Sequence, residues 1–168
     1  MQGKLQQIYR VAKELGQNSH FEGSLELSQL PRLSSLVIPD DAEIRLKFEF
    51  TARLFDHPSI SGHVETQLKL ECQRCLEPMV LPIAIDFNLL IDASDEDVQA
   101  YQMETVYSDD GYLDLYGVIE DELILALPLI SMHEEETCNT HWQPAAEPEV
   151  VVKKDNPFLV LKSLKEKT

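Results

Sequence analysis

Residues 60–91 read ISGHVETQLKLECQRCLEPMVLPIAIDFNLLI, two alternating runs of apolar and polar residues on either side of a Cys-x-x-Cys turn. In the first run, most of the alternate residues from Ile60 to Cys72 are apolar. In the second run, every second residue from Ile83 to Ile91 is apolar. A period of two is typical of strands that bury one face and expose the other. The stretch therefore predicts a β-hairpin with the two cysteines at its tip.

A third strand is predicted just before this hairpin. Every second residue from Ile44 to Leu54 is apolar, and charged residues or Thr51 lie between them. Three such strands in succession predict an antiparallel meander. We also expect a short strand over residues 21–27.

The clearest helix signal lies after the sheet. Asp114 is a typical N-cap, and the apolar pattern continues to Leu127, where Pro128 ends it. Shorter amphipathic helices are predicted at residues 4–15 and from Asn156 onward. The fold class is therefore α+β: an antiparallel β-sheet packed by one central amphipathic helix, with short terminal helices.

The chain has 168 residues, which suits one domain with a real core. We expect a single α+β domain over residues 1–152 and a basic tail or helix over 153–168. No secretory signal or membrane-spanning apolar run is present in the sequence. Three cysteines, an odd number, fit a reducing compartment, so we expect a cytoplasmic protein without membrane contact.

The net charge of −16 is unevenly distributed. Residues 75–152 contain 18 Asp or Glu and no Lys or Arg, whereas residues 1–74 carry a net charge of −1. The tail from residue 153 carries +3, with Lys153, Lys154, Lys162 and Lys165 among its lysines. Because the acidic block repels phosphate, it disfavours broad nucleic-acid binding and favours basic protein partners.

Cys72 and Cys75 have the spacing of a zinc knuckle. Cys138 can supply a third ligand, and His133 or His141 a fourth, which predicts a Cys3His site. The alternative is a set of reduced structural thiols. Thiol–disulfide catalysis is a weaker alternative. Redox motifs of this kind usually place the first cysteine at a helix N-terminus, which lowers its pKa, whereas here a predicted strand precedes it.

The predicted central helix places one carboxylate on its apolar face. When residues 115–127 are placed at 100° steps around a helix axis, Glu122 falls within the apolar face, and Glu120 and Asp121 fall outside it. A buried carboxylate needs a donor, and the planar guanidinium of Arg74 suits it. We therefore predict a structural pair between Arg74 and Glu122 and a solvated or partner-facing surface at Glu120 and Asp121. All four residues are also candidates for contact with a partner or RNA.

Four motifs in this order closely resemble the bacterial YceD family, the large ribosomal RNA subunit accumulation proteins. The motifs are Leu70–Cys75, Ile119–Pro128, His133 with Cys138, and Asn156-Pro157-Phe158 followed by Leu161–Lys165. The resemblance implies a small cytoplasmic, non-enzymatic factor for accumulation or processing of large-subunit (23S) ribosomal RNA. Cysteines are not a fixed feature of that family, so the resemblance itself implies no metal.

Three functional hypotheses follow. In the first, an assembly factor or chaperone contacts a basic large-subunit ribosomal protein through the acidic block, and its lysine tail reaches the RNA. In the second, the chain binds precursor large-subunit RNA directly through the tail, Arg74 and the strand residues Arg45, Lys47 and Arg53. A thiol or metal enzyme, or a small zinc-binding structural protein, is the third. No glycine-rich phosphate loop or nucleophile elbow supports catalysis or a small-molecule substrate.

Overall fold

The computed structural model describes residues 5–54, 57–134 and 138. A five-stranded sheet in the order β2-β3-β4-β5-β6 forms its centre. Its strands are β2 (His20–Glu26), β3 (Glu43–Leu54), β4 (His57–Glu71), β5 (Pro78–Ile91) and β6 (Glu104–Val106). The first four are antiparallel, and the short β6 pairs in parallel with the end of β5. The predicted α+β fold with an antiparallel meander is confirmed.

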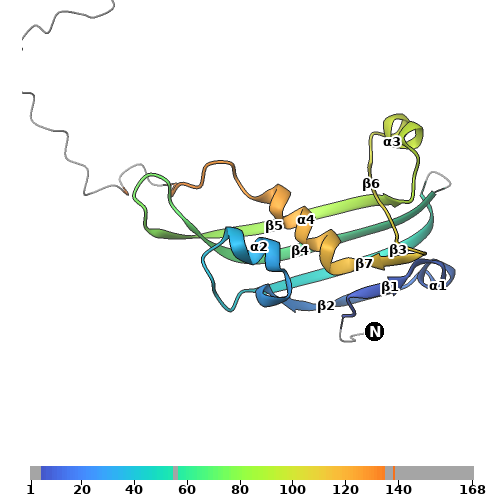
Figure 1. Cartoon of the computed structure of the whole chain (residues 1–168), viewed down its shortest axis with the longest axis horizontal. Coiled ribbons are helices and arrows are strands. Elements are labelled where there is room, and N and C mark those ends of the chain that lie inside the picture. The colour runs from blue at the N-terminus through green and yellow to red at the C-terminus, as the bar shows by residue number, and fades with distance from the viewer. Residues whose placement is uncertain (1–4, 55–56, 135–137, 139–168) are drawn as a thin grey trace, which may run out of the picture.

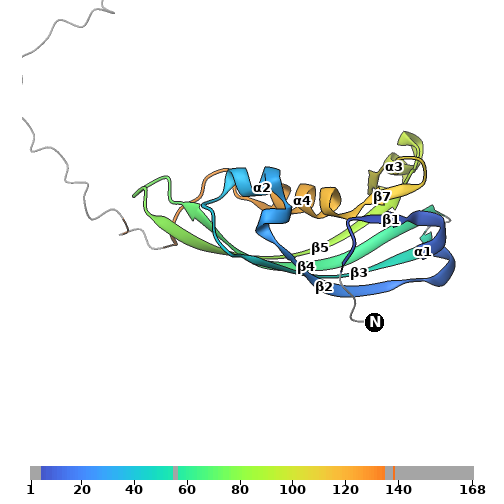
Figure 2. The ribbon, with the colours of Figure 1, turned by 60° about the horizontal axis from the view of Figure 1, so that its bottom comes forward.

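Helices cover one face of this sheet (Figures 1 and 2). They are α2 (Pro31–Leu36) and α4 (Leu115–Ala126), which lie beside each other, with α1 (Val11–Gln17) and α3 (Asp95–Tyr101) at the end of the sheet. A second, two-stranded sheet joins β1 (Ile8–Arg10) to β7 (Tyr112–Asp114). A 3-10 turn at Leu27–Gln29 connects β2 to α2.

Alternation in the strands produces the buried face. Ile44, Leu46, Phe48 and Phe50 of β3 are each at most 3% exposed, as are Ile60, Val64 and Leu68 of β4. Leu115, Ile119 and Leu123 of α4 are fully buried and belong to the same core. The core therefore lies between the inner face of the sheet and the helices.

Gly62 lies where the pattern places an inward side chain. It is opposite Phe48 on one side and Phe87 on the other. A Cβ atom built there would lie 2.5 Å from the carbonyl oxygen of Lys47 and 2.7 Å from the ring of Phe87. Glycine is thus required by the close approach of the β3 backbone and of the Phe87 ring.

The central helix begins and ends where the sequence predicts. The Asp114 carboxylate accepts hydrogen bonds from the amides of Tyr116 and Gly117, at 3.1 and 3.3 Å. The helix ends at Ala126, two residues before Pro128. This cap and this proline fix its position in the chain.

The N-terminal helix was predicted too early. Residues Ile8–Arg10 form a strand with β7, and the helix starts only at Val11. Pairing with β7 satisfies backbone groups that the helical pattern of residues 4–15 alone does not reveal. The predicted C-terminal helix and the basic tail lie outside the described residues.

Candidate functional site

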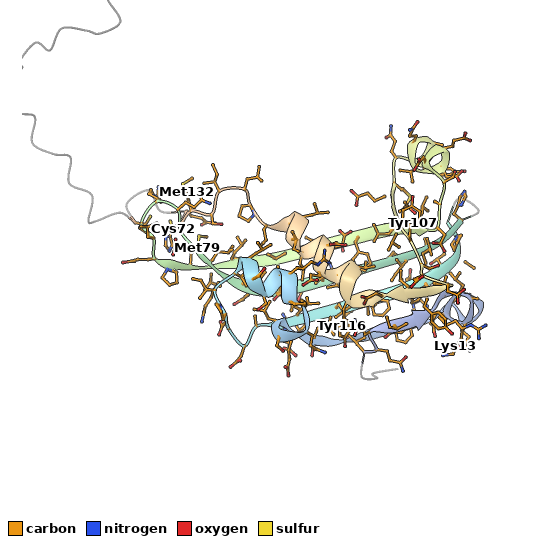
Figure 3. The ribbon with its side chains drawn as sticks, viewed as in Figure 1. Lys13, Cys72, Met79, Tyr107, Tyr116 and Met132 are labelled. Atoms are coloured by element: carbon orange, nitrogen blue, oxygen red, sulfur yellow. The ribbon has the colours of Figure 1, made fainter. Side chains whose placement is uncertain are left out.

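The tip of the β4–β5 hairpin is a tight turn over residues 72–77. The amide of Cys72 donates to the carbonyl of Glu77 at 2.9 Å, and the amide of Leu76 donates to the carbonyl of Cys72 at 2.8 Å. Leu76 adopts a left-handed conformation with a φ of 63°. The turn holds the two cysteines at one end of the molecule, opposite α1 (Figures 1 and 3).

The chain returns to this tip after α4. The amide of Gln73 donates to the carbonyl of Ser131 at 2.8 Å, and Ser131 is buried. Figure 1 shows the segment after α4 running alongside the hairpin end. This contact brings His133 and Cys138 to the two cysteines of the turn.

Four potential metal ligands meet here. Donor atoms of Cys72, Cys75, His133 and Cys138 all lie within 4.8 Å of one another. The Cys72 and Cys138 sulfurs are 3.9 Å apart, and the Cys75 sulfur lies 3.4 Å from Nδ1 of His133. The predicted set of three cysteines and His133 is therefore brought together, and the cluster can bind a metal ion such as zinc. The alternative ligand His141 lies outside the described residues.

The surroundings of the cluster favour the thiolate form of Cys72. Burial opposes ionisation of Cys72, but backbone N–H groups of Cys75, His133 and Arg74 outweigh it and lower the pKa of this thiol to about 5. The guanidinium Nε of Arg74 donates to the Cys138 sulfur at 3.0 Å. Thiolates are the form in which cysteine binds metals.

The predicted pair between Arg74 and Glu122 is wrong. Besides Cys138, Arg74 donates to the carbonyl of His133 at 3.0 Å. Glu122 lines a groove with Leu89 and Glu104 between α4 and β6. Leu89 lies eleven residues along β5 from Pro78, about 36 Å at 3.3 Å per residue, so Glu122 is far from the hairpin tip.

The buried carboxylate of α4 is Glu120 instead. It is 4% exposed and accepts from the amides of Arg32 and Leu33, at 2.6 and 3.0 Å, and from Nε of Arg32 at 2.8 Å. The 100° projection placed Glu120 outside the apolar face because it considered only the sheet. Since α2 covers the flank of α4, that flank is buried as well.

Asp121 and Glu122 have different environments. Asp121 is exposed and accepts from the Arg32 guanidinium at 2.6 Å. Burial raises the pKa of Glu122, and the Glu104 and Asp121 carboxylates raise it further. Glu120 is therefore an internal structural residue, whereas a partner-facing role for Asp121 and Glu122 stays a prediction.

Sequence reasoning missed Arg32. Its segment between Pro31 and Pro39 shows no clear periodicity and predicts neither a helix nor a strand. The available signal was Pro31 at the first position of a helix, because the free amides that follow form an anion site in the first turn. Glu120 occupies that position from a distant part of the chain.

Two strand residues proposed for RNA contact are paired with acids. Arg45 lies 3.2 Å from Glu65, and Lys47 lies 3.1 Å from Glu22, on the face of the sheet opposite α4. Such pairs reduce the positive potential available to phosphate. The predicted tail contacts Lys153, Lys154, Lys162 and Lys165 lie outside the described residues.

Exposed apolar side chains surround the end of α4 and the hairpin tip. Leu129 is 98% exposed and Leu76 is 68% exposed; Leu125, Ile130 and Met132 are also exposed. In the part of the chain that the structure describes, no helix is long and apolar enough to cross a membrane. Exposed apolar residues grouped in this way are typical of protein interaction surfaces.

Comparison with known proteins identifies relatives of the chain. The family model described as "Large ribosomal RNA subunit accumulation protein YceD" matches residues 60–165, which include the cluster and α4. A Haemophilus influenzae protein with the same description is 34% identical over 164 residues, covering 92% of each chain. No solved structure matches the chain.

Proposed function

Since the chain belongs to the YceD family of large ribosomal RNA subunit accumulation proteins, we propose that it is a non-enzymatic ribosome biogenesis factor. It promotes the synthesis, processing or accumulation of large-subunit (23S) ribosomal RNA in the cytoplasm. The family match across the hairpin tip, α4 and the C-terminal region carries this proposal. The protein acts by binding rather than by chemistry on a small molecule.

The acidic surface favours a protein partner as the direct contact. The block over residues 75–152 holds 18 acidic residues and no Lys or Arg, and Asp121 and Glu104 are exposed within it. Exposed Leu125 and Leu129 lie on the same part of the chain. A basic, amphipathic segment of a large-subunit ribosomal protein complements both the exposed carboxylates and the exposed leucines. The aliphatic parts of its lysine side chains would pack on the leucines, and their ammonium groups would lie near the carboxylates.

Direct contact with precursor RNA is the second candidate, and the lysine-rich tail favours it. Residues 153–168 carry five lysines against two acidic residues. In this second arrangement the chain binds the precursor RNA directly through the tail, without a protein between them. Both contacts weaken with added salt, since both depend on opposite charges.

A structural zinc ion at the Cys3His cluster is part of the proposal. A protein that works by binding must present a fixed surface, and the cluster connects the hairpin tip to the segment after α4. The zinc ion stabilises this connection and takes no part in a reaction.

The ratio of large- to small-subunit ribosomal RNA tests the proposal. In a bacterial strain depleted of this protein, we expect that ratio to fall and the full-length chain to restore it. A chain lacking residues 153–168 and a chain with Glu104→Gln and Asp121→Asn separate the roles of tail and acidic surface. An unchanged ratio on depletion contradicts the proposal.

A further inference from the structure

The cluster at the hairpin tip is assembled from two parts of the chain that are about sixty residues apart. Cys72 and Cys75 come from the turn between β4 and β5, and His133 and Cys138 come from the segment after α4. The bond from Gln73 to Ser131 holds the two parts together beside the cluster. Four metal-binding side chains from two distant segments therefore converge on one point.

The distances within the cluster fit a tetrahedral zinc site. Zinc–sulfur bonds of about 2.3 Å and zinc–nitrogen bonds of about 2.05 Å give tetrahedral edges of about 3.8 Å between sulfurs and about 3.6 Å between sulfur and nitrogen. The Cys72–Cys138 distance is 3.9 Å, and the Cys75–His133 distance is 3.4 Å. The remaining distances, all within 4.8 Å, need only small side-chain rotations to reach these values.

Charge balance identifies a further residue of the site. One Zn²⁺ with three thiolates and a neutral imidazole carries a net charge of −1, in a block of sequence that is already strongly acidic. Arg74 supplies the compensating +1, because its guanidinium lies 3.0 Å from the Cys138 sulfur and 3.0 Å from the His133 carbonyl. It thus contacts one ligand directly and fixes the backbone of another.

We propose that Cys72, Cys75, His133 and Cys138 bind one Zn²⁺ ion, that Arg74 balances its charge, and that the ion fixes the segment after α4 to the hairpin tip. Four protein ligands fill the tetrahedron and leave no position for water or substrate, so the ion is structural. Arg74 is a positioning residue of this site. The inference rests on the structural zinc ion of the proposed function and adds its charge partner and the contact that it fixes; its tests are separate from the ribosomal RNA proposal, since metal content is measured without reference to function.

Metal analysis of the full-length protein tests the ligand set. We expect about one zinc per chain after purification under reducing conditions, and loss of that zinc in Cys138→Ser and His133→Ala. The control is His63→Ala, because His63 lies on the sheet face, 2.7 Å from Asp86 and away from the cluster. Retention of zinc by Cys138→Ser, or its loss from the control, contradicts the assignment.

Cobalt substitution provides a second readout that does not depend on the metal retained during purification. Co²⁺ added to the metal-free protein should give sulfur-to-metal charge transfer and the intense visible bands of a tetrahedral site. Absence of both zinc in the purified protein and these bands on reconstitution overturns the proposal and leaves three reduced structural thiols.

Arg74 is tested by zinc affinity. Residues outside the ligand shell that contact ligands typically contribute roughly 10- to 100-fold to metal affinity. We expect Arg74→Ala to weaken zinc binding by this factor in chelator competition at unchanged stoichiometry, and Arg74→Lys to recover part of the loss. The control is Arg45→Ala, which removes an exposed ion pair with Glu65 on the sheet. Wild-type affinity in Arg74→Ala contradicts the role of Arg74.

Hydrogen exchange tests the structural consequence. Removal of zinc by a chelator should speed exchange of the Gln73 amide, which bonds to Ser131, and of amides in residues 129–134. Amides of β4 between Ile60 and Glu65 should be unaffected, since this part of the strand pairs with both β3 and β5. Equal protection of Gln73 with and without zinc contradicts the proposed fixing of the segment.

Discussion

Arg32 binds the carboxylate of Glu120 through both its backbone amide and its guanidinium, at 2.6 and 2.8 Å. The adjacent amide of Leu33 completes the contact at 3.0 Å. Since Arg32 lies in the first turn of the short helix α2 and Glu120 lies in the middle of α4, this contact joins the two helices that cover the sheet (Figure 2). The carboxylate also satisfies free amides at the first turn of α2.

Replacing Glu120 should destabilise the fold. Glu120→Ala leaves the buried Leu33 amide without its acceptor, and an unsatisfied buried group costs about 1–3 kcal/mol. The ion pair with Arg32 adds little, because the arginine side chain is 54% exposed. Urea unfolding measures the change. Asp121→Ala, which removes only the exposed pair, should change the free energy of unfolding by less than about 1 kcal/mol, and an equal loss in both variants contradicts this account.

The contribution of Glu120 should depend on pH. Burial opposes its ionisation, but the amides of Leu33 and Arg32 and the Arg32 guanidinium outweigh it and lower its pKa below the usual value of 4.5. Its stabilising effect is therefore complete above the unfolded pKa and is lost as pH falls through the folded pKa. The difference in unfolding free energy between wild type and Glu120→Gln should be largest at neutral pH and shrink below pH about 4. A pH-independent difference contradicts the lowered pKa.

Glu122 should behave in the opposite way. Burial and the neighbouring Glu104 and Asp121 raise its pKa, so its charged form is disfavoured in the folded protein. Its protonated form favours folding below the unfolded pKa, and this benefit is lost as pH rises through the folded pKa. Glu122→Gln should therefore increase the free energy of unfolding at pH 7 and have little effect at pH 3. Loss of stability at pH 7 indicates a favourable partner for the carboxylate.

Gly62→Ala should be strongly destabilising. The added methyl group meets the Lys47 carbonyl at 2.5 Å and the β-carbon of Phe48 at 2.8 Å, so the strands must separate. Overpacking of this kind typically costs about 1–3 kcal/mol. Thermal and urea unfolding measure the loss, and Gly16→Ala, with nothing within 4 Å of the added atom, is the matched control. Wild-type stability of Gly62→Ala contradicts the packing described.

Most of the sheet was predictable because its signal is local. Alternation with a period of two marks β3, β4 and the buried half of β5, and the cap and proline mark α4. The short strands β1 and β7 were not predicted, because three-residue segments carry no periodicity and depend on pairing across the chain. The parallel pairing of β6 was missed for the same reason.

The candidate site was predictable only in part. Residue type and spacing identify Cys72, Cys75, Cys138 and His133, since few side chains bind metals. The salt bridge of α4 was misassigned, because a helical projection shows which residues share a face but not which elements cover it. The contact between Arg32 and Glu120 depends on the position of α2, which the sequence around Pro31 leaves open.

The most direct test of the central claim is to isolate the tagged protein from bacterial lysate and to identify the retained RNA and proteins before and after ribonuclease treatment. The account predicts enrichment of large-subunit over small-subunit ribosomal RNA, and a basic large-subunit ribosomal protein that persists after ribonuclease through the acidic surface. Loss of every protein with ribonuclease assigns the direct contact to RNA instead. Enrichment of neither large-subunit RNA nor a large-subunit protein contradicts the account.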